Sequence, residues 1–412
     1  MSSKNLPQEA YVWIWLPEAT EPVVAGLLSR QDSTLVFNYG KSYLERTNAI
    51  PIYEPELPLK SGLLPLLKDL SMPNCIRDAS PDAWGRRVLL YRSGSTLGGQ
   101  LEPDELICLL ESGSDRIGAL DFQRSPTEYV PRQGAHASLE ELMEAAQKVQ
   151  EGLPISKALD QALQHGTSIG GARPKVMIES GDKKYIAKFS SSTDVYNVVK
   201  AEYIAMRLAK LVGIDAAPVK LEKAMGKDVL FVERFDRVKT ANGWQRKSMV
   251  SALTILGLGE MQARYASYED LAEIVRSRFT ESGKTLRELF SRIVFNILCG
   301  NTDDHARNHA AFWDGSYLTL TQAYDICPQS RTGNEASQAM LIIGQKRMSK
   351  LSVCVEAAHK FQLSSNEAQK IIDQQQHGIN EHWGLVCDEA KLTTLESKQL
   401  MGRQFLNPFI SW

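Results

Sequence analysis

Residues 300–308 read GNTDDHARN, and the interpretation of the whole chain starts from this stretch. It is a polar segment that begins with glycine and follows the apolar run IVFNILC at 293–299. It contains two adjacent carboxylates, two amides, a histidine and an arginine. A carboxylate can accept a proton from a reacting group, and carboxylate and amide oxygens can hold a hard cation. The stretch therefore predicts a catalytic loop with a metal site.

The spacing within this loop favours phosphoryl transfer. Asp303 and Asn308 stand in the form D-x-x-x-x-N, in which protein kinases place the aspartate that accepts the hydroxyl proton and the asparagine that binds Mg²⁺. Asp304 is an alternative base, but its spacing to Asn308 is one residue too short. A second metal-binding aspartate should follow a short strand, and Asp325 follows the alternating residues 318–320. Mg²⁺ often takes only one or two carboxylates beside phosphate oxygens, so this set suffices.

An upstream glycine-containing stretch is a candidate phosphate loop. Residues 168–175 read SIGGARPK, where two glycines let backbone N–H groups approach an anion and Arg173 and Lys175 add positive charge. It is not a Walker loop, and a simple turn also explains its glycines. Lys188 follows on the next strand, and in kinases such a lysine binds phosphates and pairs with a helix glutamate, here Glu202. The alternatives are a lysine at a sheet edge and a glutamate on an exposed helix face.

The stretch FVERFDRV at 231–238 is a candidate hinge between two lobes. Its backbone groups would meet the edge of an adenine and Phe235 would pack nearby, although an ordinary strand end has the same pattern. Each of these motifs is ambiguous by itself. Their order, from glycine loop through lysine, helix glutamate and hinge to the catalytic loop and Asp325, indicates a nucleotide bound between two lobes.

We expect an α+β, bilobal fold with three parts. Residues 1–125 read as a small α+β subdomain, in which Ser80 is expected to cap a helix that starts at the next residue. Residues 126–240 read as a nucleotide-binding lobe with the glycine loop, two strands joined by a tight turn, and a helix that ends at Gly213. Residues 241–412 read as a mostly helical lobe that carries the catalytic and metal-binding loops.

Length and composition are those of a globular protein with two or three domains. The chain has 412 residues, and its net charge of −2 implies no broad nucleic-acid-binding surface. It has no apolar stretch long enough to span a bilayer and no signal-peptide pattern, so we expect a cytoplasmic protein without membrane contact. The six cysteines are far apart and are expected to be free thiols. His305 and His309 lack a third ligand, which argues against a zinc site.

Several stretches together carry a resemblance to a known family. FNYGKSYLER and ASPDAWGRRVLL match its N-terminal subdomain, and SIGGARPK, IAKF, AEYIAMRLAKLVGI, VERFDR, GNTDDHARNHA and YDICP match its kinase core in order and spacing. Over nearly its whole length the chain resembles the HipA family of toxin-type serine/threonine kinases from bacterial toxin–antitoxin systems, which have a kinase-like fold. YDICP lacks the glycine of the D-F-G signature, which suits an atypical kinase.

This resemblance implies a role for each site residue. Asp303 would be the catalytic base, Asn308 and Asp325 would hold Mg²⁺, and Glu202 would be the ion-pair partner of Lys188. The residues implied to bind ATP are Ile169, Gly170, Gly171, Ala172, Arg173, Lys175, Lys188, Glu233, Phe235 and His305.

The resemblance also implies an internal switch. Members of the family autophosphorylate a serine just before the glycine loop, and Ser168 occupies that position here, with Thr167 as the alternative acceptor. A phosphoserine adds a charge of about −1.5 to −2. Beside a site for ATP phosphates it should repel the nucleotide and push the loop outward. Autophosphorylation would then turn the kinase off.

The implied partners are a protein substrate, with an aminoacyl-tRNA synthetase as the family precedent, and a helix-turn-helix antitoxin. DNA would be contacted only indirectly, through that antitoxin, in the cytoplasm of a bacterium. Two other functions fit parts of the pattern. The same fold serves kinases of small molecules, and a co-repressor module could act with a DNA-binding partner without turning over ATP.

Overall fold

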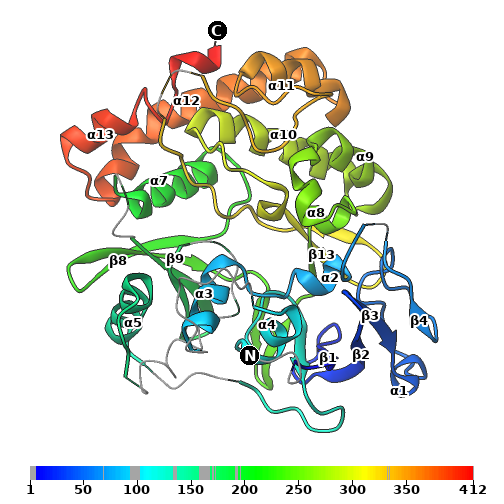
Figure 1. Ribbon diagram of the computed structural model, residues 1–412. Coiled ribbons are helices and arrows are strands. Elements are labelled where there is room, and N and C mark those ends of the chain that lie inside the picture. Colours follow the sequence, from blue (N-terminus) through cyan, green and yellow to red (C-terminus); the bar gives the residue numbers. More distant parts are fainter. Residues whose placement is uncertain are drawn as a thin grey trace.

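The structure is a computed structural model, and it describes residues 6–67, 69–92, 103–132, 137–156, 168, 171, 173–190, 194, 196–331, 333 and 335–411. Helices α9 to α13 gather at one end of the molecule and the larger sheets at the other (Figure 1). The α+β class expected from the sequence is confirmed.

The first part of the chain folds around an antiparallel sheet in the order β4-β3-β2-β1-β5. A bulge between Val12 and Trp13 shifts the register of β1 against β2. The strands are β1 (Glu9–Ile14), β2 (Val23–Gln31), β3 (Thr34–Tyr39), β4 (Leu63–Leu64) and β5 (Leu120–Gln123). The helices beside them are α1 (Lys41–Leu44), α2 (Asn74–Arg77), α3 (Ala83–Arg92) and α4 (Glu105–Glu111).

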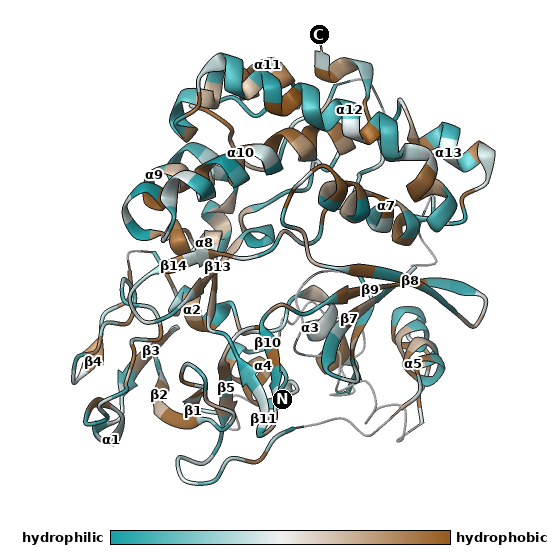
Figure 2. Cartoon of the chain, turned by 180° about the vertical axis from the view of Figure 1, so that it is seen from behind, coloured by the Kyte–Doolittle hydropathy of each residue, from teal (hydrophilic) through white to brown (hydrophobic). Residues whose placement is uncertain are grey.

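A second antiparallel sheet, in the order β6-β7-β9-β8, has helices on both faces. Because side chains alternate along a strand, Val229 and Phe231 of β9 pack with α3 and α5, whereas Leu230 and Val232 pack in the core cluster that includes α7. Figure 2 shows α7 and α5 on opposite sides of this sheet. The elements are α5 (Leu139–Glu151), β6 (Lys175–Ser180), β7 (Lys183–Phe189), α7 (Val198–Leu211), β8 (Val219–Ala224) and β9 (Lys227–Glu233).

Local sequence explains the hairpin and the helix of this lobe. Gly181, with φ of 64°, makes the turn between β6 and β7. Asn197 caps α7 by accepting the N–H of Lys200, and Gly213, with φ of 93°, lies just past its end. The expected strand pair and the expected helix end are both confirmed.

The start of α3 differs from the expectation. The hydroxyl of Ser80 donates to Glu105 at 3.2 Å, so it does not cap the helix. The first helical hydrogen bond runs from the N–H of Arg86 to the carbonyl of Asp82 at 2.8 Å, and α3 begins at Ala83. The prediction of Ser80 as the cap was wrong because α3 begins two residues later than expected, which leaves Ser80 outside the capping position.

The helical lobe is built around α10, whose residues from Arg292 to Cys299 are all buried. Its helical elements are α8 (Ala252–Ile255), η3 (Glu260–Tyr265), α9 (Tyr268–Arg278), α10 (Ser282–Cys299), η4 (Ala306–Asn308), α11 (Leu351–Ala357), η5 (Ala358–Phe361), α12 (Ser365–Glu389), α13 (Thr394–Leu400) and η6 (Pro408–Ser411). Within the described ranges, no helix combines the length and the apolar character needed to cross a membrane. All six cysteines are free, as expected.

Short strands lie between the sheets and the helices. β10 (Arg237–Thr240) and β11 (Gly243–Arg246) form a hairpin, and β12 (Met249–Ser251), β13 (Ala310–Trp313) and β14 (Leu318–Leu320) form a three-stranded sheet. Of these strands, only β14 was expected. β13 follows the GNTDDHARN loop directly and β14 precedes Asp325, so this small sheet fixes both segments of the candidate site.

Gly300 ends α10 in the left-handed conformation, with φ of 70°. A Cβ at this position would lie 2.6 Å from the carbonyl oxygen of Gln404, so only glycine fits beneath the C-terminal segment. The N–H of Leu406 also donates to the carbonyl of Leu298 at 2.8 Å. The C-terminal segment thus forms one wall at the start of the loop.

Candidate functional site

The two adjacent aspartates of the loop have different environments. Asp303 is exposed, whereas Asp304 is 3% exposed and accepts a hydrogen bond from His309 Nε2 at 2.9 Å. The hydroxyl of Tyr268 lies 3.2 Å from the same ring nitrogen. Asp304 is therefore held in the interior, and Asp303 is the aspartate that faces solvent.

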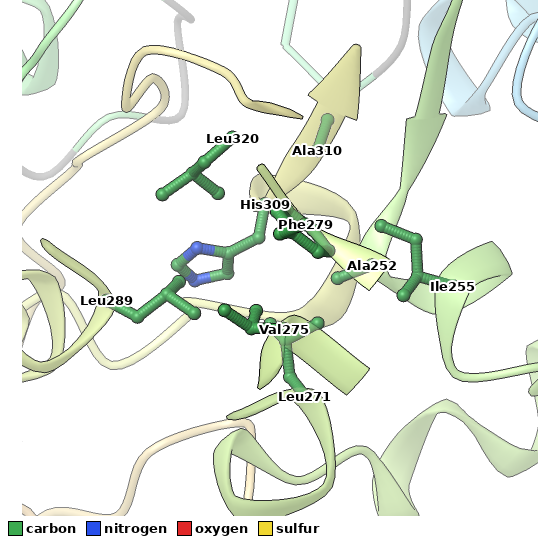
Figure 3. A pocket seen from close by; sticks show the side chains of 9 residues that line it. All are labelled: Ala252, Ile255, Leu271, Val275, Phe279, Leu289, His309, Ala310 and Leu320. Atoms are coloured by element: carbon green, nitrogen blue, oxygen red, sulfur yellow. The ribbon is translucent and has the colours of Figure 1, made fainter. Parts of the chain in front are cut away.

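His309 supports the loop from below. Its ring points into an apolar pocket, among Val275, Phe279 and Leu289 (Figure 3). These side chains leave no space for a water molecule. Asp304 and His309 are both buried, so water does not compete for the hydrogen bond between them, and this bond helps to fix the backbone beside Asp303.

Asn308 lies at the other end of the loop, in the single turn η4. It is 7% exposed, and its Nδ2 donates to the carbonyl of Asp303 at 3.3 Å. The amide thus closes the loop on itself and leaves its own carbonyl oxygen as a ligand of the type that Mg²⁺ accepts.

Lys188, Glu202 and Asp325 meet at the junction of the lobes. The Nζ of Lys188, on β7, lies 2.5 Å from Glu202 Oε1, on α7, and also donates to Asp325. The structure thus joins three residues that are far apart in the sequence. It brings the strand lysine, the helix glutamate and the candidate metal aspartate into one cluster.

The charges of Lys188 and Asp325 stabilise each other. Burial disfavours the Lys188 ammonium, but the carboxylates of Asp325 and Glu202 outweigh it and raise its pKa above the ordinary value. Lys188 in turn holds the pKa of Asp325 well below its usual range. Burial raises the pKa of Glu202, with Lys188 acting in the opposite direction. Asp325 is therefore ionised and able to hold a cation.

Asp325 also has an unusual backbone. Its φ is 58°, a left-handed conformation that non-glycine residues adopt rarely. The hydroxyl of the preceding Tyr324 donates to the carbonyl of Arg307 at 2.7 Å. The segment that carries Asp325 is therefore tied to the catalytic loop.

Part of the glycine loop is described. Gly171 has φ of 96°, and a Cβ there would collide with the side-chain end of Lys175. Arg173 pairs with Asp194 at 2.6 Å. Burial, followed by the charge of Lys188, lowers the pKa of Lys175 to about 8. The predicted residues Thr167, Ile169, Gly170 and Ala172 lie outside the described residues.

Ser168 lies against Asp115 of the N-terminal subdomain. It is 2% exposed, and its hydroxyl donates to the carbonyl of Asp115 at 3.3 Å. The carboxylate of Asp115 accepts from Lys184, Arg234 and Arg237 at 2.7 to 3.0 Å. Ser168 therefore sits beside a dense group of paired charges.

The candidate hinge has its backbone donors partly engaged. The N–H groups of Glu233 and Arg234 donate to Pro218 and Lys184 at 2.9 and 2.8 Å, and the side chain of Glu233 pairs with Lys183 at 2.6 Å. The ring of Phe235 packs against Tyr324 and Phe312, with centroids 5.7 and 5.9 Å apart. Phe235 thus lies next to the segment of Asp325. The Glu233 carboxylate instead points to Lys183, at the turn between β6 and β7.

The alternative of a histidine metal site has no support. In the described parts of the chain, no group of three or more His, Cys, Asp or Glu residues is arranged to hold a metal. His309 is hydrogen-bonded to Asp304. His305 is exposed, and its charge helps to lower the pKa of Asp325. Asn308 and Asp325 carry oxygen donors of the kind that suits a hard cation.

Sequence reasoning missed two residues that join the parts of the site. Asp82 accepts from the N–H of Gly171 at 2.7 Å and from Arg307 Nη1 at 3.1 Å. Arg307 also pairs with Glu260. No local spacing relates Asp82 to Arg307, because they come from different ends of the chain. The one signal in the sequence was that Asp82 is an acidic residue at the start of the helix predicted after Ser80.

A strand lysine paired with a helix glutamate, followed by a D-x-x-x-x-N loop and an aspartate, defines a protein-kinase-like arrangement. The chain belongs to the HipA family. The family model described as the HipA-like C-terminal domain matches residues 167–383, and that of the HipA N-terminal domain matches residues 16–123.

Known structures and sequences agree with this assignment. A chain from the Shewanella oneidensis complex of HipA, HipB and operator DNA superposes with a TM-score of 0.70, covering 97% of this chain and 99% of that chain at 19% identity. This match confirms the kinase-like fold of the HipA type. A putative kinase of Sinorhizobium fredii, Y4mE, is 30% identical over 150 residues, which are 35% of this chain and 34% of that protein.

The serine/threonine-protein kinase toxin HipA of Shewanella oneidensis is 27% identical over 184 residues, which are 39% of this chain and 42% of that protein. The matched region thus spans less than half the length of either of these two curated relatives.

Proposed function

We propose that this protein is an ATP- and Mg²⁺-dependent serine/threonine protein kinase of the HipA toxin type. The observation that carries the proposal is the contact of Lys188 with both Glu202 and Asp325. In kinases this lysine–glutamate pair and the metal-binding aspartate must both be in place for phosphoryl transfer. Lys188 and Glu202 are both buried, and their pairing offsets the cost of burying each charge.

Asp303 is the proposed base. Its neighbour Asp304 is buried against His309 and cannot reach a substrate hydroxyl without breaking that hydrogen bond. Asp303 is exposed on the same loop, where a hydroxyl from another protein could approach it. It would orient that hydroxyl and accept its proton during transfer.

Asn308 and Asp325 are the proposed Mg²⁺ ligands. Both offer hard oxygen donors, and Asp325 is kept ionised by Lys188. The bound ion would neutralise charge on the phosphates. Lys188 and Lys175 would bind phosphate oxygens, Arg173 would support the glycine loop, and Phe235 would pack beside the base.

Autophosphorylation at Ser168 is proposed as an off-switch. The hydroxyl is buried against the Asp115 carbonyl, so a phosphate, which adds about −1.5 to −2 charge, has no room there. A phosphorylated Ser168 would therefore have to leave this place and take the glycine loop with it. Thr167 remains the alternative acceptor.

The partners are proposed from the family. The similar solved structure contains HipA together with HipB and operator DNA. We infer that this chain binds a helix-turn-helix antitoxin, that it contacts DNA only through that antitoxin, and that it acts in the bacterial cytoplasm. The substrate whose phosphorylation is toxic would be a cellular protein, and an aminoacyl-tRNA synthetase is the first candidate to assay.

The experiment is intact-mass measurement and peptide mapping of the purified protein before and after incubation with Mg·ATP. We expect one added phosphate on the peptide that contains Thr167 and Ser168, and none in Asp303→Asn. The Ser168→Ala variant distinguishes the two acceptors. If the wild type binds ATP but neither it nor an added protein gains phosphate, the kinase proposal is wrong.

A further inference from the structure

The N-terminal subdomain reaches into the candidate site at Gly171. The carboxylate of Asp82 accepts the N–H of Gly171 at 2.7 Å, and the N–H of Trp84 donates to the carbonyl of Gly171 at 3.1 Å. The indole Nε1 of Trp84 also donates to the carbonyl of Lys175 at 3.1 Å. The start of α3 therefore holds the glycine loop by both its donor and its acceptor groups.

The same carboxylate holds the catalytic loop. The second oxygen of Asp82 accepts from Arg307 Nη1 at 3.1 Å, and Arg307 lies in the loop that carries Asp303. The carbonyl of Arg307 accepts the hydroxyl of Tyr324, the residue before Asp325. One side chain of the N-terminal subdomain thus connects the glycine loop, the catalytic loop and the segment of Asp325.

We propose that Asp82 is a positioning residue, which keeps the glycine loop and the catalytic loop in register for phosphoryl transfer. The N-terminal subdomain is then a working part of the nucleotide site and not only a surface for partners. Charge-assisted hydrogen bonds are short and directional, and a loop held in place before binding loses less freedom when the nucleotide arrives. This inference rests on the proposed kinase function.

The test compares Asp82→Ala and Asp82→Asn with wild type. Glu105→Gln is the matched control, because Glu105 pairs with Arg77 and Arg86 inside the same subdomain. Steady-state KM for ATP and kcat are measured for autophosphorylation or ATP turnover. Hydrogen exchange of the peptide containing Gly171 is measured without nucleotide.

We expect Asp82→Ala to raise KM for ATP about tenfold, because the glycine loop loses its hydrogen bond to the carboxylate. It should also lower kcat, because the catalytic loop loses its contact through Arg307. Asp82→Asn keeps an acceptor for the Gly171 N–H and should fall between Asp82→Ala and wild type. Glu105→Gln should leave KM unchanged. A loss of folded protein would lower only the apparent kcat, so an unchanged KM for ATP in Asp82→Ala would overturn the proposal.

Hydrogen exchange separates this inference from the proposed function. If the wild type does not turn over ATP, the kinase proposal fails, but the Gly171 peptide still reports on the contact. Faster exchange in Asp82→Ala than in wild type and Glu105→Gln would support an anchored loop. Equal exchange in all three proteins would overturn the positioning role, whatever the activity.

Discussion

At the scale of single residues, two lysines are neighbours on adjacent strands of the lobe that carries the glycine loop, which we call the glycine lobe. Lys175 of β6 and Lys188 of β7 are paired in the strand register. Lys188 contacts two carboxylates. The pKa of Lys188 is raised, whereas burial and the charge of Lys188 lower that of Lys175 to about 8.

This difference predicts a pH dependence of nucleotide use. A protonated Lys175 attracts phosphate oxygens, and it loses that charge as the pH rises through about 8. We expect kcat/KM for ATP to fall about tenfold between pH 7 and pH 9, since kcat/KM reports the free enzyme. Lys175→Arg should keep its charge and flatten this limb. A profile that is the same in both proteins would assign the titration to another group.

A second titration belongs to Glu56 of the N-terminal subdomain. Burial raises the pKa of Glu56 to about 7 from its ordinary 4.5, although the N–H of Cys75 donates to it at 2.7 Å. The folded state thus keeps a proton that the unfolded chain loses. The stabilisation from this group is complete below pH 4.5 and is lost as the pH rises to about 7.

Glu56→Gln removes this titration while keeping an acceptor for Cys75. Between pH 4.5 and pH 8, the free energy of unfolding of the wild type should fall by about 3 kcal/mol relative to the variant. Urea unfolding at several pH values measures this difference. A constant difference across the range would show that Glu56 titrates normally in the folded protein.

At the scale of elements, α3 belongs to two parts of the fold. It is a helix of the N-terminal subdomain by sequence, yet Trp84 and Val88 pack in the core of the glycine lobe with α5, β6, β7 and β9. Trp84 is 1% exposed. The glycine lobe therefore depends on a helix from outside it for one face of its sheet.

Substitutions of Trp84 should separate packing from hydrogen bonding. Trp84→Ala is expected to lower the free energy of unfolding by about 3–5 kcal/mol, because it opens a cavity in this core. Trp84→Phe keeps most of the ring but loses the donor to Lys175, and it should cost about 1–2 kcal/mol. Thermal or urea unfolding measures both. Equal losses would contradict the assignment of a packing role.

The sequence could predict elements with local signals. The β6–β7 turn was visible from Gly181, and α7 from its apolar spacing and Gly213. The strands β12 and β13 were missed, because they are short and pair across a long stretch of helical sequence. In the same way, Asp303, Asn308 and Lys188 stood out by motif spacing. Asp82 did not, because its partners lie in distant segments and its role exists only in the folded chain.

At the scale of the whole molecule, the subdomain and the helical lobe share one core. Buried residues of elements as far apart in the sequence as β1 and η6 belong to the same hydrophobic cluster. Polar contacts cross the same boundary. The carboxylate of Asp78 accepts from the N–H and hydroxyl of Ser251 and from the hydroxyl of Thr254, each at 2.7 Å, at the start of α8. The subdomain is thus fastened both to α8 and to the catalytic loop.

Asp78→Ala should weaken this connection. We expect a loss of about 3 kcal/mol in the free energy of unfolding, because three donors lose a charged acceptor. In calorimetry, the N-terminal subdomain should begin to unfold before the helical lobe. Glu45→Ala, which removes an exposed partner of Lys41, is the control and should change stability by less than about 0.5 kcal/mol. A single unshifted transition in Asp78→Ala would argue against the connection.

The contact of Gln404 with Gly300 has a consequence for the order in which the newly synthesised chain folds. A ribosome makes a chain from its N-terminus, so the GNTDDHARN loop emerges well before the segment that packs against its first residue. A nascent protein in which the two larger sheets and α10 have already folded still lacks the segment that covers one side of this loop. Phosphotransfer competence would then appear only after Leu406 has been synthesised and has folded back.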